Sequence, residues 1–114
     1  MKARIPQNMQ QSQNMNQMIR QAQKMQEEMT AFQEEFASRE FKAAVGGGAV
    51  EITMNGAREV LGVHISPEVI DPEDSEMLED LIASAVNEVI KNIDTASESG
   101  MQKITGGMSM PGLF

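Results

Sequence analysis

The sequence lacks cysteine, tryptophan and tyrosine, and it contains a single histidine. Without cysteine, disulfide bonds, zinc sites with thiolate ligands and cysteine nucleophiles are excluded. One histidine excludes a metal site built from three histidines, and the missing Trp and Tyr exclude a stacking surface of several aromatic rings. No run of about 18 apolar residues, which a membrane-spanning helix needs, is present. The first residues lead into Gln and Asn rather than an apolar segment, so we also expect no secretory signal. We expect no catalytic residues, no metal, no cofactor and no membrane contact.

The chain has 114 residues and a mass of 12.5 kDa, which suits one domain. Its apolar content of 40% includes few aromatic residues, so we expect a small hydrophobic core. A small core favours association with a second subunit. Residues 1–58 hold seven basic and six acidic side chains, whereas residues 59–114 hold two and eleven. A polyanion is therefore expected to meet the N-terminal half first. Ordinary solvated surface accounts for the same asymmetry.

The N-terminal part predicts a long helix. Residues 1–12 have no period and are rich in Gln, so we expect a flexible arm. From residue 15 the apolar side chains follow the 3-4 spacing of a heptad seam. The seam consists of Met15, Met18, Ala22, Met25, Met29, Phe32 and Phe36. This spacing predicts a helix over about residues 13–39, part of which projects from the domain.

Alternating residues then predict three antiparallel strands. Gly46-Gly47-Gly48 is expected to form the first turn, and Asn55-Gly56 a two-residue type I′ turn. The second turn predicts pairs between Met54 and Ala57, Ile52 and Glu59, and Val50 and Leu61. The apolar face of this hairpin, expected to serve core or dimer packing, comprises Val50, Ile52, Met54, Leu61, Val63 and Ile65.

A second helix is expected after Ser66-Pro67, opened by residues 71–74 with Asp71 as its cap. Its apolar stripe reaches about residue 97, and Gly100 is expected to end it. The predicted fold is α+β with the order α-β-β-β-α. It comprises a single domain over residues 13–99 and a flexible Gly-rich tail over residues 100–114.

The chain resembles the YbaB/EbfC family of nucleoid-associated proteins over about residues 14–114. The matching stretches are residues 20–29 (RQAQKMQEEM), 46–56 (GGGAVEITMNG), 63–67 (VHISP), 75–81 (SEMLEDL) and 110–114 (MPGLF). The resemblance implies a small cytoplasmic bacterial protein that associates with the nucleoid. It also implies a tweezer-like homodimer with paired sheets at its centre and projecting helices. Binding of double-stranded DNA with little sequence preference, affecting nucleoid organisation or gene expression, is the implied function.

Basic and amide side chains near the N-terminus are the candidate DNA ligands. Such a binder needs cations that neutralise phosphates. Arg20 and Lys24 are four residues apart and share a helix face outside the seam. Lys2 and Arg4 lie on the expected arm, and neutral hydrogen bonds are available from Gln17 and Gln21. The alternative is that Arg20 and Lys24 only solvate a coiled-coil surface.

Other features carry weaker functional predictions. His64 is expected on the polar sheet face in a structural role, and Gly46-Gly47-Gly48 lacks the Lys-Ser/Thr of a phosphate-binding loop. The acids at the start of the second helix are expected to complement the helix dipole rather than bind metal; they are Glu73, Asp74, Glu76, Glu79 and Asp80. The rival function is a protein-interaction module that recruits an unidentified partner through the Met-rich seam.

Overall fold

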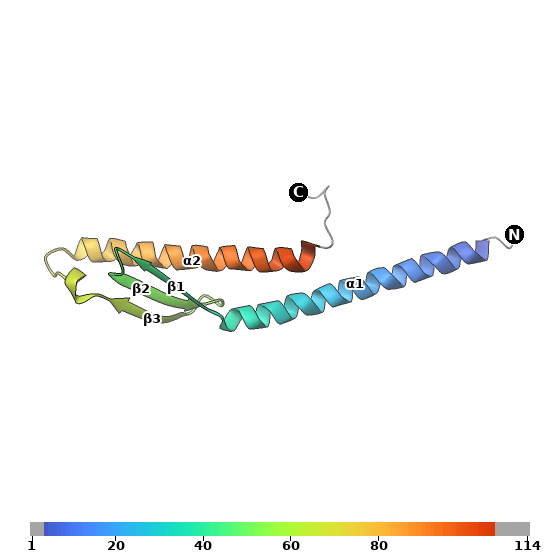
Figure 1. Cartoon of the computed structure of the whole chain (residues 1–114), viewed down its shortest axis with the longest axis horizontal. Coiled ribbons are helices and arrows are strands. Elements are labelled where there is room, and N and C mark those ends of the chain that lie inside the picture. The colour runs from blue at the N-terminus through green and yellow to red at the C-terminus, as the bar shows by residue number, and fades with distance from the viewer. Residues whose placement is uncertain (1–3, 107–114) are drawn as a thin grey trace.

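Figure 1 shows the computed structural model, which describes residues 4–106 and the side chains of residues 14–106. The elements are α1 (Arg4–Ser38), β1 (Glu40–Val45), β2 (Val50–Asn55), β3 (Val60–Ile65), the short 3₁₀ helix η1 (Pro67–Val69) and α2 (Ser75–Thr105). The α-β-β-β-α order and the α+β class predicted from the sequence are confirmed. The molecule is elongated, with extents of 90 × 26 × 16 Å.

The three strands form one antiparallel sheet in the order β1-β2-β3, and α2 covers β1 and β2. The core lies between them, because alternate residues of β2 and every fourth residue of α2 point to the same layer. Its fully buried side chains are Val50 and Ile52 from β2 and Ala85, Val89 and Ile93 from α2. Burial of each larger aliphatic side chain contributes about 1.5–3 kcal/mol relative to exposure.

The turn between β1 and β2 is the glycine turn that the sequence predicts. Gly46, Gly47 and Gly48 have φ values of 64°, 67° and 92°, which side chains with a Cβ rarely adopt. A Cβ at the first position would also lie 2.9 Å from the end of the Leu81 side chain. This close approach brings the start of α2 onto the sheet.

The predicted register between β2 and β3 is wrong. Val50 pairs with Ile65 and Ile52 with Val63, so each partner lies four residues further along than expected. Because four is even, each side chain keeps its predicted face of the sheet. Met54 pairs with Val60, three residues beyond its predicted partner Ala57. The irregularity between Thr53 and Met54 accounts for this difference of one residue from the other pairs.

The turn that joins these strands explains the shift. It contains three residues, Gly56, Ala57 and Arg58, with Arg58 at φ 66°. The Asn55 side chain accepts a hydrogen bond from the Glu59 N–H at 2.9 Å and donates one to the Glu59 carboxylate at 3.0 Å. The loop is therefore closed by an asparagine side chain rather than by a two-residue type I′ turn.

Both helices are longer than predicted. α1 begins at Arg4, so residues 4–12 are helical instead of forming the expected irregular arm. Pro6 lies in the first turn, where its missing N–H removes no helical hydrogen bond, and Gln and Met are good helix formers. Residues 1–3 of that arm lie outside the described part of the chain.

The boundaries of α2 also differ from the prediction. Its cap is Asp74, whose side chain accepts from the Met77 N–H at 3.4 Å, whereas Asp71 accepts from the Glu73 N–H in the preceding turn. The helix continues through Gly100 to Thr105, because this glycine packs against Phe32 instead of ending the helix. Residues 107–114 of the expected tail lie outside the described residues.

Candidate nucleic-acid interface

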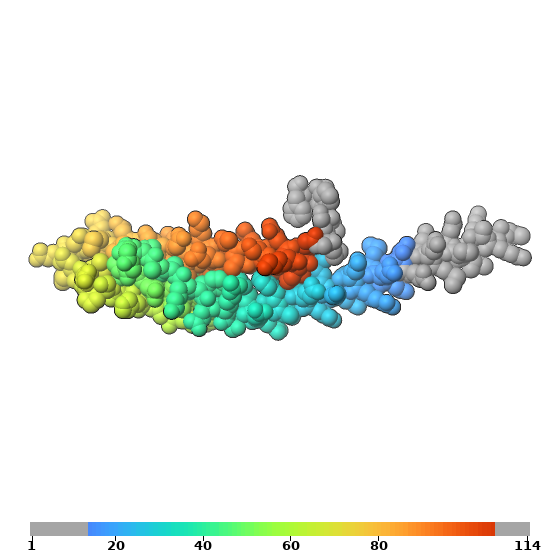
Figure 2. Space-filling view, in the orientation of Figure 1, coloured from blue at the N-terminus to red at the C-terminus, as the bar shows by residue number. Residues whose placement is uncertain are grey.

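α1 is anchored at its C-terminal end and projects at its N-terminal end. Phe36 is buried in the core at 8% exposure, Phe32, Met29 and Met25 are half-buried, and residues 14–24 are all exposed. Figure 2 shows this exposed part of α1 extending beyond the body formed by the sheet and α2. The heptad seam therefore packs on the body over its second half only.

Four of the predicted DNA ligands lie together on this projecting segment. At about 100° per residue, Gln17, Arg20, Gln21 and Lys24 fall within a helix face of about 100°. All four side chains are exposed. The face is centred about 120° around the helix axis from the seam. The cations are thus free to approach a ligand while the seam faces another direction.

The positive side chains of this face form no ion pair within the described residues. Among residues 14–106 the ion pair that forms joins Arg58 to Asp94, and neither Arg20 nor Lys24 takes part in one. Of the other two predicted cations, Arg4 begins α1 with its side chain outside the described set, and Lys2 lies outside the described residues.

The N-terminal segment of the chain, residues 1–26, is called the arm below. The positions of the acidic residues separate this arm from the body more sharply than a division at residue 58 indicates. Glu27 is the first acidic residue of the chain, so residues 1–26 carry Lys2, Arg4, Arg20 and Lys24 and no acid. All 17 acidic residues of the chain, Glu27 included, lie after residue 26. Dividing the sequence at residue 26 instead of residue 58 would have identified this positive segment.

The acidic side chains at the start of α2 lie far from the arm. Figure 1 shows that this end of α2 and the N-terminal end of α1 are at opposite ends of the molecule. Charges are screened beyond about 8 Å at physiological ionic strength, whereas the molecule is 90 Å long. These acids therefore weaken the field around Arg20 and Lys24 very little, despite the net charge of −8.

Lys103 is a cation that the sequence analysis did not select. It is exposed in the last turn of α2, the end of that helix that lies alongside α1. Its position beside the arm depends on the continuation of α2 through Gly100. A prediction that ended the helix at this glycine had no means of placing Lys103.

The predicted packing face is divided between the core and an exposed strand. Val50, Ile52 and Met54 of β2 are buried within the chain at 0–4% exposure. On β3, Leu61 and Val63 are exposed at 53% and 52%, and Ile65 is half-buried. Within the described residues β3 has a strand neighbour on one side only, and α2 packs mainly on β1 and β2. An apolar strand with an open edge is a surface suited to pairing.

The other candidate groups are not assembled into a site in the described residues. His64 is exposed on β3 opposite Glu51, as expected for a polar sheet face. Residues 14–106 place no three His, Cys, Asp or Glu side chains together in a way that could hold a metal ion. None of the described helices combines the length and apolarity required to cross a bilayer.

Residues 9–108 match the YbaB/EbfC DNA-binding family, and the chain belongs to this family. The resemblance noted in the sequence is thereby confirmed.

Curated relatives agree with this assignment, and a solved structure shares the fold. A nucleoid-associated protein of Clostridium acetobutylicum is 50% identical over 100 residues, covering 88% of this chain and 89% of the relative. A nucleoid-associated protein of Clostridium novyi is 48% identical over 101 residues, covering 89% of each. The crystal structure of an uncharacterized protein from Helicobacter pylori shares the fold, with a TM-score of 0.59 and 23% identity over 68% of this chain and 82% of that one.

Proposed function

We propose that this protein binds double-stranded DNA at the nucleoid as a homodimer, through the N-terminal parts of its two α1 helices. The observation that carries the proposal is the exposed face formed by Gln17, Arg20, Gln21 and Lys24 on a segment without acids. The curated relatives named nucleoid-associated proteins support it. Cytoplasmic location and an effect on nucleoid organisation or gene expression follow from this role.

Two copies are needed because one arm carries few cations. In a homodimer, each phosphate contact of Arg20 and Lys24 occurs twice, and phosphate contacts supply most of the affinity of non-specific binders. A partner subunit packed on β3 would cover Leu61 and Val63, which are half-exposed in the single chain. Two arms held by such a central pairing would either clamp one duplex or bridge two.

Low sequence specificity follows from the chemistry of the arm. Arg and Lys on an exposed helix contact phosphates without regard to sequence, whereas base discrimination requires several bidentate contacts to base edges. The four described side chains include one arginine and two glutamines, and neither glutamine is fixed by a neighbouring side chain. The arm is therefore equipped to position DNA rather than to read it.

The test is a binding series with a random-sequence duplex at increasing salt concentrations. Arg20→Glu/Lys24→Glu should abolish binding, because it reverses both cations of the exposed face on each arm. The wild-type log–log salt slope should contain about 0.9 for each neutralised phosphate, or about 3.6 from the two Arg20 and two Lys24 side chains of a dimer. Lys42→Glu/Lys91→Glu is the matched control, since it reverses two exposed cations of the body and changes the net charge equally.

The control should retain most of the wild-type affinity. Equal loss in both double variants would show that net charge, rather than the arm, governs binding, and would overturn the proposed interface. Absence of wild-type binding at low salt would overturn the function itself and favour the protein-interaction module.

A further inference from the structure

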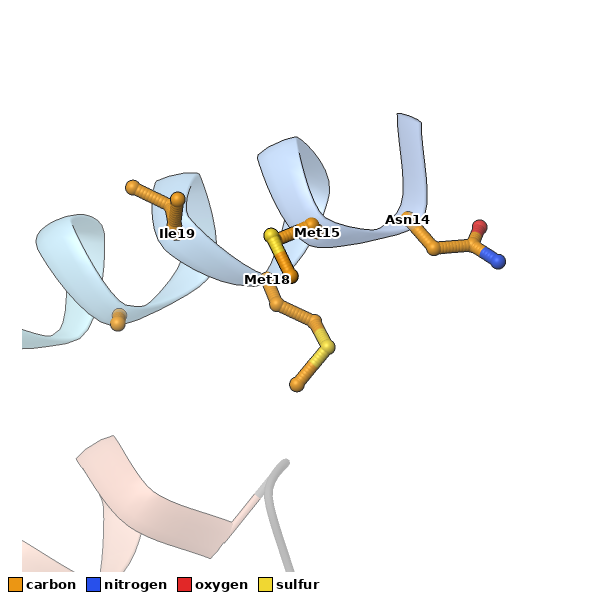
Figure 3. Close-up of a pocket in the computed structure, with 5 residues that line it drawn as sticks. Asn14, Met15, Met18 and Ile19 are labelled. Carbon is orange, nitrogen blue, oxygen red and sulfur yellow. The ribbon is translucent and has the colours of Figure 1, made fainter. Parts of the chain in front are cut away.

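Within the described residues, little packing restrains the outer part of the arm. Met15, Met18 and Ile19 are 64%, 68% and 50% exposed, and Figure 3 shows their side chains projecting from α1. In a helix held at one end, a small rotation at that end becomes a large displacement at the other. Arg20 lies about 24 Å along the helix from Phe36, so a rotation of about 10° at Phe36 displaces it by about 4 Å. This exceeds the length of a hydrogen bond, about 3 Å. The position of the cationic face therefore depends on contacts near Phe36.

The turn between β2 and β3 contacts both the C-terminal end of α1 and α2. On the α1 side, the Gly56 N–H donates a hydrogen bond to the Arg39 carbonyl at 3.0 Å, and a Cβ on Gly56 would lie 2.0 Å from the Phe36 carbonyl oxygen. On the α2 side, the Arg58 guanidinium forms an ion pair with the Asp94 carboxylate. This short turn therefore connects the end of α1 to α2.

Arg58 adopts a backbone conformation that arginine disfavours. Its φ of 66° lies in the left-handed region, and the other described residues with positive φ are glycines. Glycine adopts this conformation readily, whereas a residue with a long side chain rarely does. A residue in such a conformation persists only where the surrounding structure holds it, and such residues cluster at functional positions. The arginine side chain is therefore expected to supply something that glycine would not.

The ion pair of Arg58 contributes little to the stability of the fold. Its two side chains are 50% and 49% exposed, and exposed pairs contribute little because solvent screens them and ordering the side chains costs entropy. The pair joins residues 36 positions apart in the sequence, so it constrains the turn relative to α2 rather than local structure. A contact of this kind suits a role in positioning.

The packing between α1 and α2 beside this turn is incomplete. A hollow of about 440 Å³ is lined by side chains that include Phe32 and Phe36 of α1, Ile93 and Met101 of α2, and Arg58 of the turn. Well-packed interiors leave few voids larger than a water molecule, so this space allows α1 to shift against α2. A link from the turn to α2 limits such a shift where side-chain packing does not.

We propose that the Arg58–Asp94 ion pair restricts the range of angles between the arm and α2, which makes Arg58 a positioning residue for Arg20 and Lys24. The pair holds the turn on α2, and the turn holds the end of α1. In the proposed homodimer the same restriction sets the spacing of the two arms. The consequence for DNA rests on the proposed function, whereas the restriction of the arm does not.

The absence of cysteine permits a direct test in the full-length chain. Asn16→Cys on the arm and Asn87→Cys on α2 replace exposed side chains and carry nitroxide labels. Labelled chain is mixed with an excess of unlabelled chain, so that pulsed EPR measures the distance distribution within one chain. In this background Arg58→Gln/Asp94→Asn removes both charges of the pair and keeps the net charge. The distribution should become about twofold broader, because the hollow then leaves α1 free to shift.

The matched control is Glu88→Gln/Lys91→Gln. It removes one acid and one base from exposed positions of α2 that form no ion pair within the described residues. Its distance distribution should keep the wild-type width. An Arg58→Gln/Asp94→Asn distribution as narrow as that of the wild type would overturn the proposal. Equal broadening in both double variants would also overturn it, because charges of α2 in general would then govern the arm.

Arg58→Gly separates positioning from stability. Glycine suits the positive φ, so the midpoint of thermal unfolding should stay at or above the wild-type value. The distance distribution should nevertheless broaden as it does in Arg58→Gln/Asp94→Asn. A lower midpoint with an unchanged width would show a purely structural role and would overturn the proposal.

The consequence for DNA is tested on the unlabelled proteins with a random-sequence duplex. Arg58→Gln/Asp94→Asn should bind about threefold more weakly, since arms that are less ordered lose more freedom on binding. The salt slope should equal that of the wild type. A slope smaller by about 0.9 for each Arg58 would make Arg58 a phosphate ligand, which overturns its positioning role. Unchanged affinity in a variant with a broadened distribution would overturn that role too. A wild type that binds no DNA would overturn the proposed function, whereas the EPR widths would still decide whether the ion pair restricts the arm.

Discussion

Gly100 of α2 lies directly against the ring of Phe32 of α1. A Cβ at position 100 would be 2.2 Å from the Cε1 and Cζ atoms of that ring, far inside van der Waals contact. The missing side chain therefore lets the two helices approach each other beyond the edge of the sheet. This contact, together with the burial of Phe36, sets the direction in which the arm leaves the body.

Gly100→Ala is expected to lower the free energy of unfolding by about 1 kcal/mol. Overpacking against Phe32 destabilises by about 1–3 kcal/mol, and the better helix propensity of alanine returns about 1 kcal/mol. In a Phe32→Ala background the clash is absent, so the same substitution should raise the free energy of unfolding by about 0.8–1.0 kcal/mol. Urea denaturation of the four proteins measures both values. The same sign in both backgrounds would contradict the assigned role of Gly100.

Gly56→Ala is expected to be more destabilising, by about 3 kcal/mol. A Cβ at this position would lie 2.0 Å from the carbonyl oxygen of Phe36, and backbone cannot rotate away as a half-buried ring can. The substitution would also disturb the hydrogen bond from the Gly56 N–H to the Arg39 carbonyl, 3.0 Å long. Thermal or urea unfolding measures the change.

The control for this substitution is Gly106→Ala. A Cβ at position 106 meets no described atom within 4 Å, and its φ of −61° suits alanine. The free energy of unfolding should therefore change by less than about 0.5 kcal/mol. A loss at Gly56 no larger than that at Gly106 would show that α1 does not approach this turn as closely as described.

Gly56 and Gly100 show which parts of the fold the sequence could predict. Alternation and heptad spacing are local patterns, so they gave the element order correctly and, on β2, the buried face. Asn55-Gly56 and Gly100 also looked like local signals, for a hairpin turn and a helix end. Both glycines instead allow a close approach to Phe36 and Phe32, residues far away in the sequence. A single sequence does not reveal such tertiary contacts, and the helix end was wrong for that reason. The hairpin register was wrong because Asn55 and Glu59 close a three-residue turn.

The candidate site was predictable to a similar extent. Helical spacing placed Arg20 and Lys24 on one outward face, because this depends only on the period of the helix. The exposure of the whole segment and the distance from the acids of α2 depend on where α1 leaves the body, which the anchoring contact of Phe32 determines. Lys103 was missed because its place beside α1 depends on that same contact.

Val63→Glu is expected to weaken the proposed homodimer without unfolding the chain. Val63 is 52% exposed on β3, so the subunit tolerates a carboxylate there, but a dimer interface that covers β3 in both subunits would bury two of them. Sedimentation at micromolar concentration should show a dimer for the wild type and a 12.5 kDa species for the variant.

Ile70→Glu is the control for the dimer prediction, since Ile70 is 54% exposed outside the sheet. It should sediment like the wild type. A wild type that sediments at 12.5 kDa would remove the dimer altogether, and a dimer that survives Val63→Glu would place the interface on a surface other than β3.

Duplexes of equal length and different base composition are expected to bind within about tenfold of one another. Phosphate contacts from Arg20 and Lys24 carry no sequence information, and a mismatch in a truly specific site typically costs about 1–3 kcal/mol for each base pair. Competition of AT-rich, GC-rich and random duplexes for the wild-type protein, at one fixed salt concentration, measures the ratio. Gln17→Ala/Gln21→Ala should leave this ratio unchanged, because the amides add affinity without reading bases. A preference of a hundredfold or more that this double variant removes would instead assign base readout to the two glutamines.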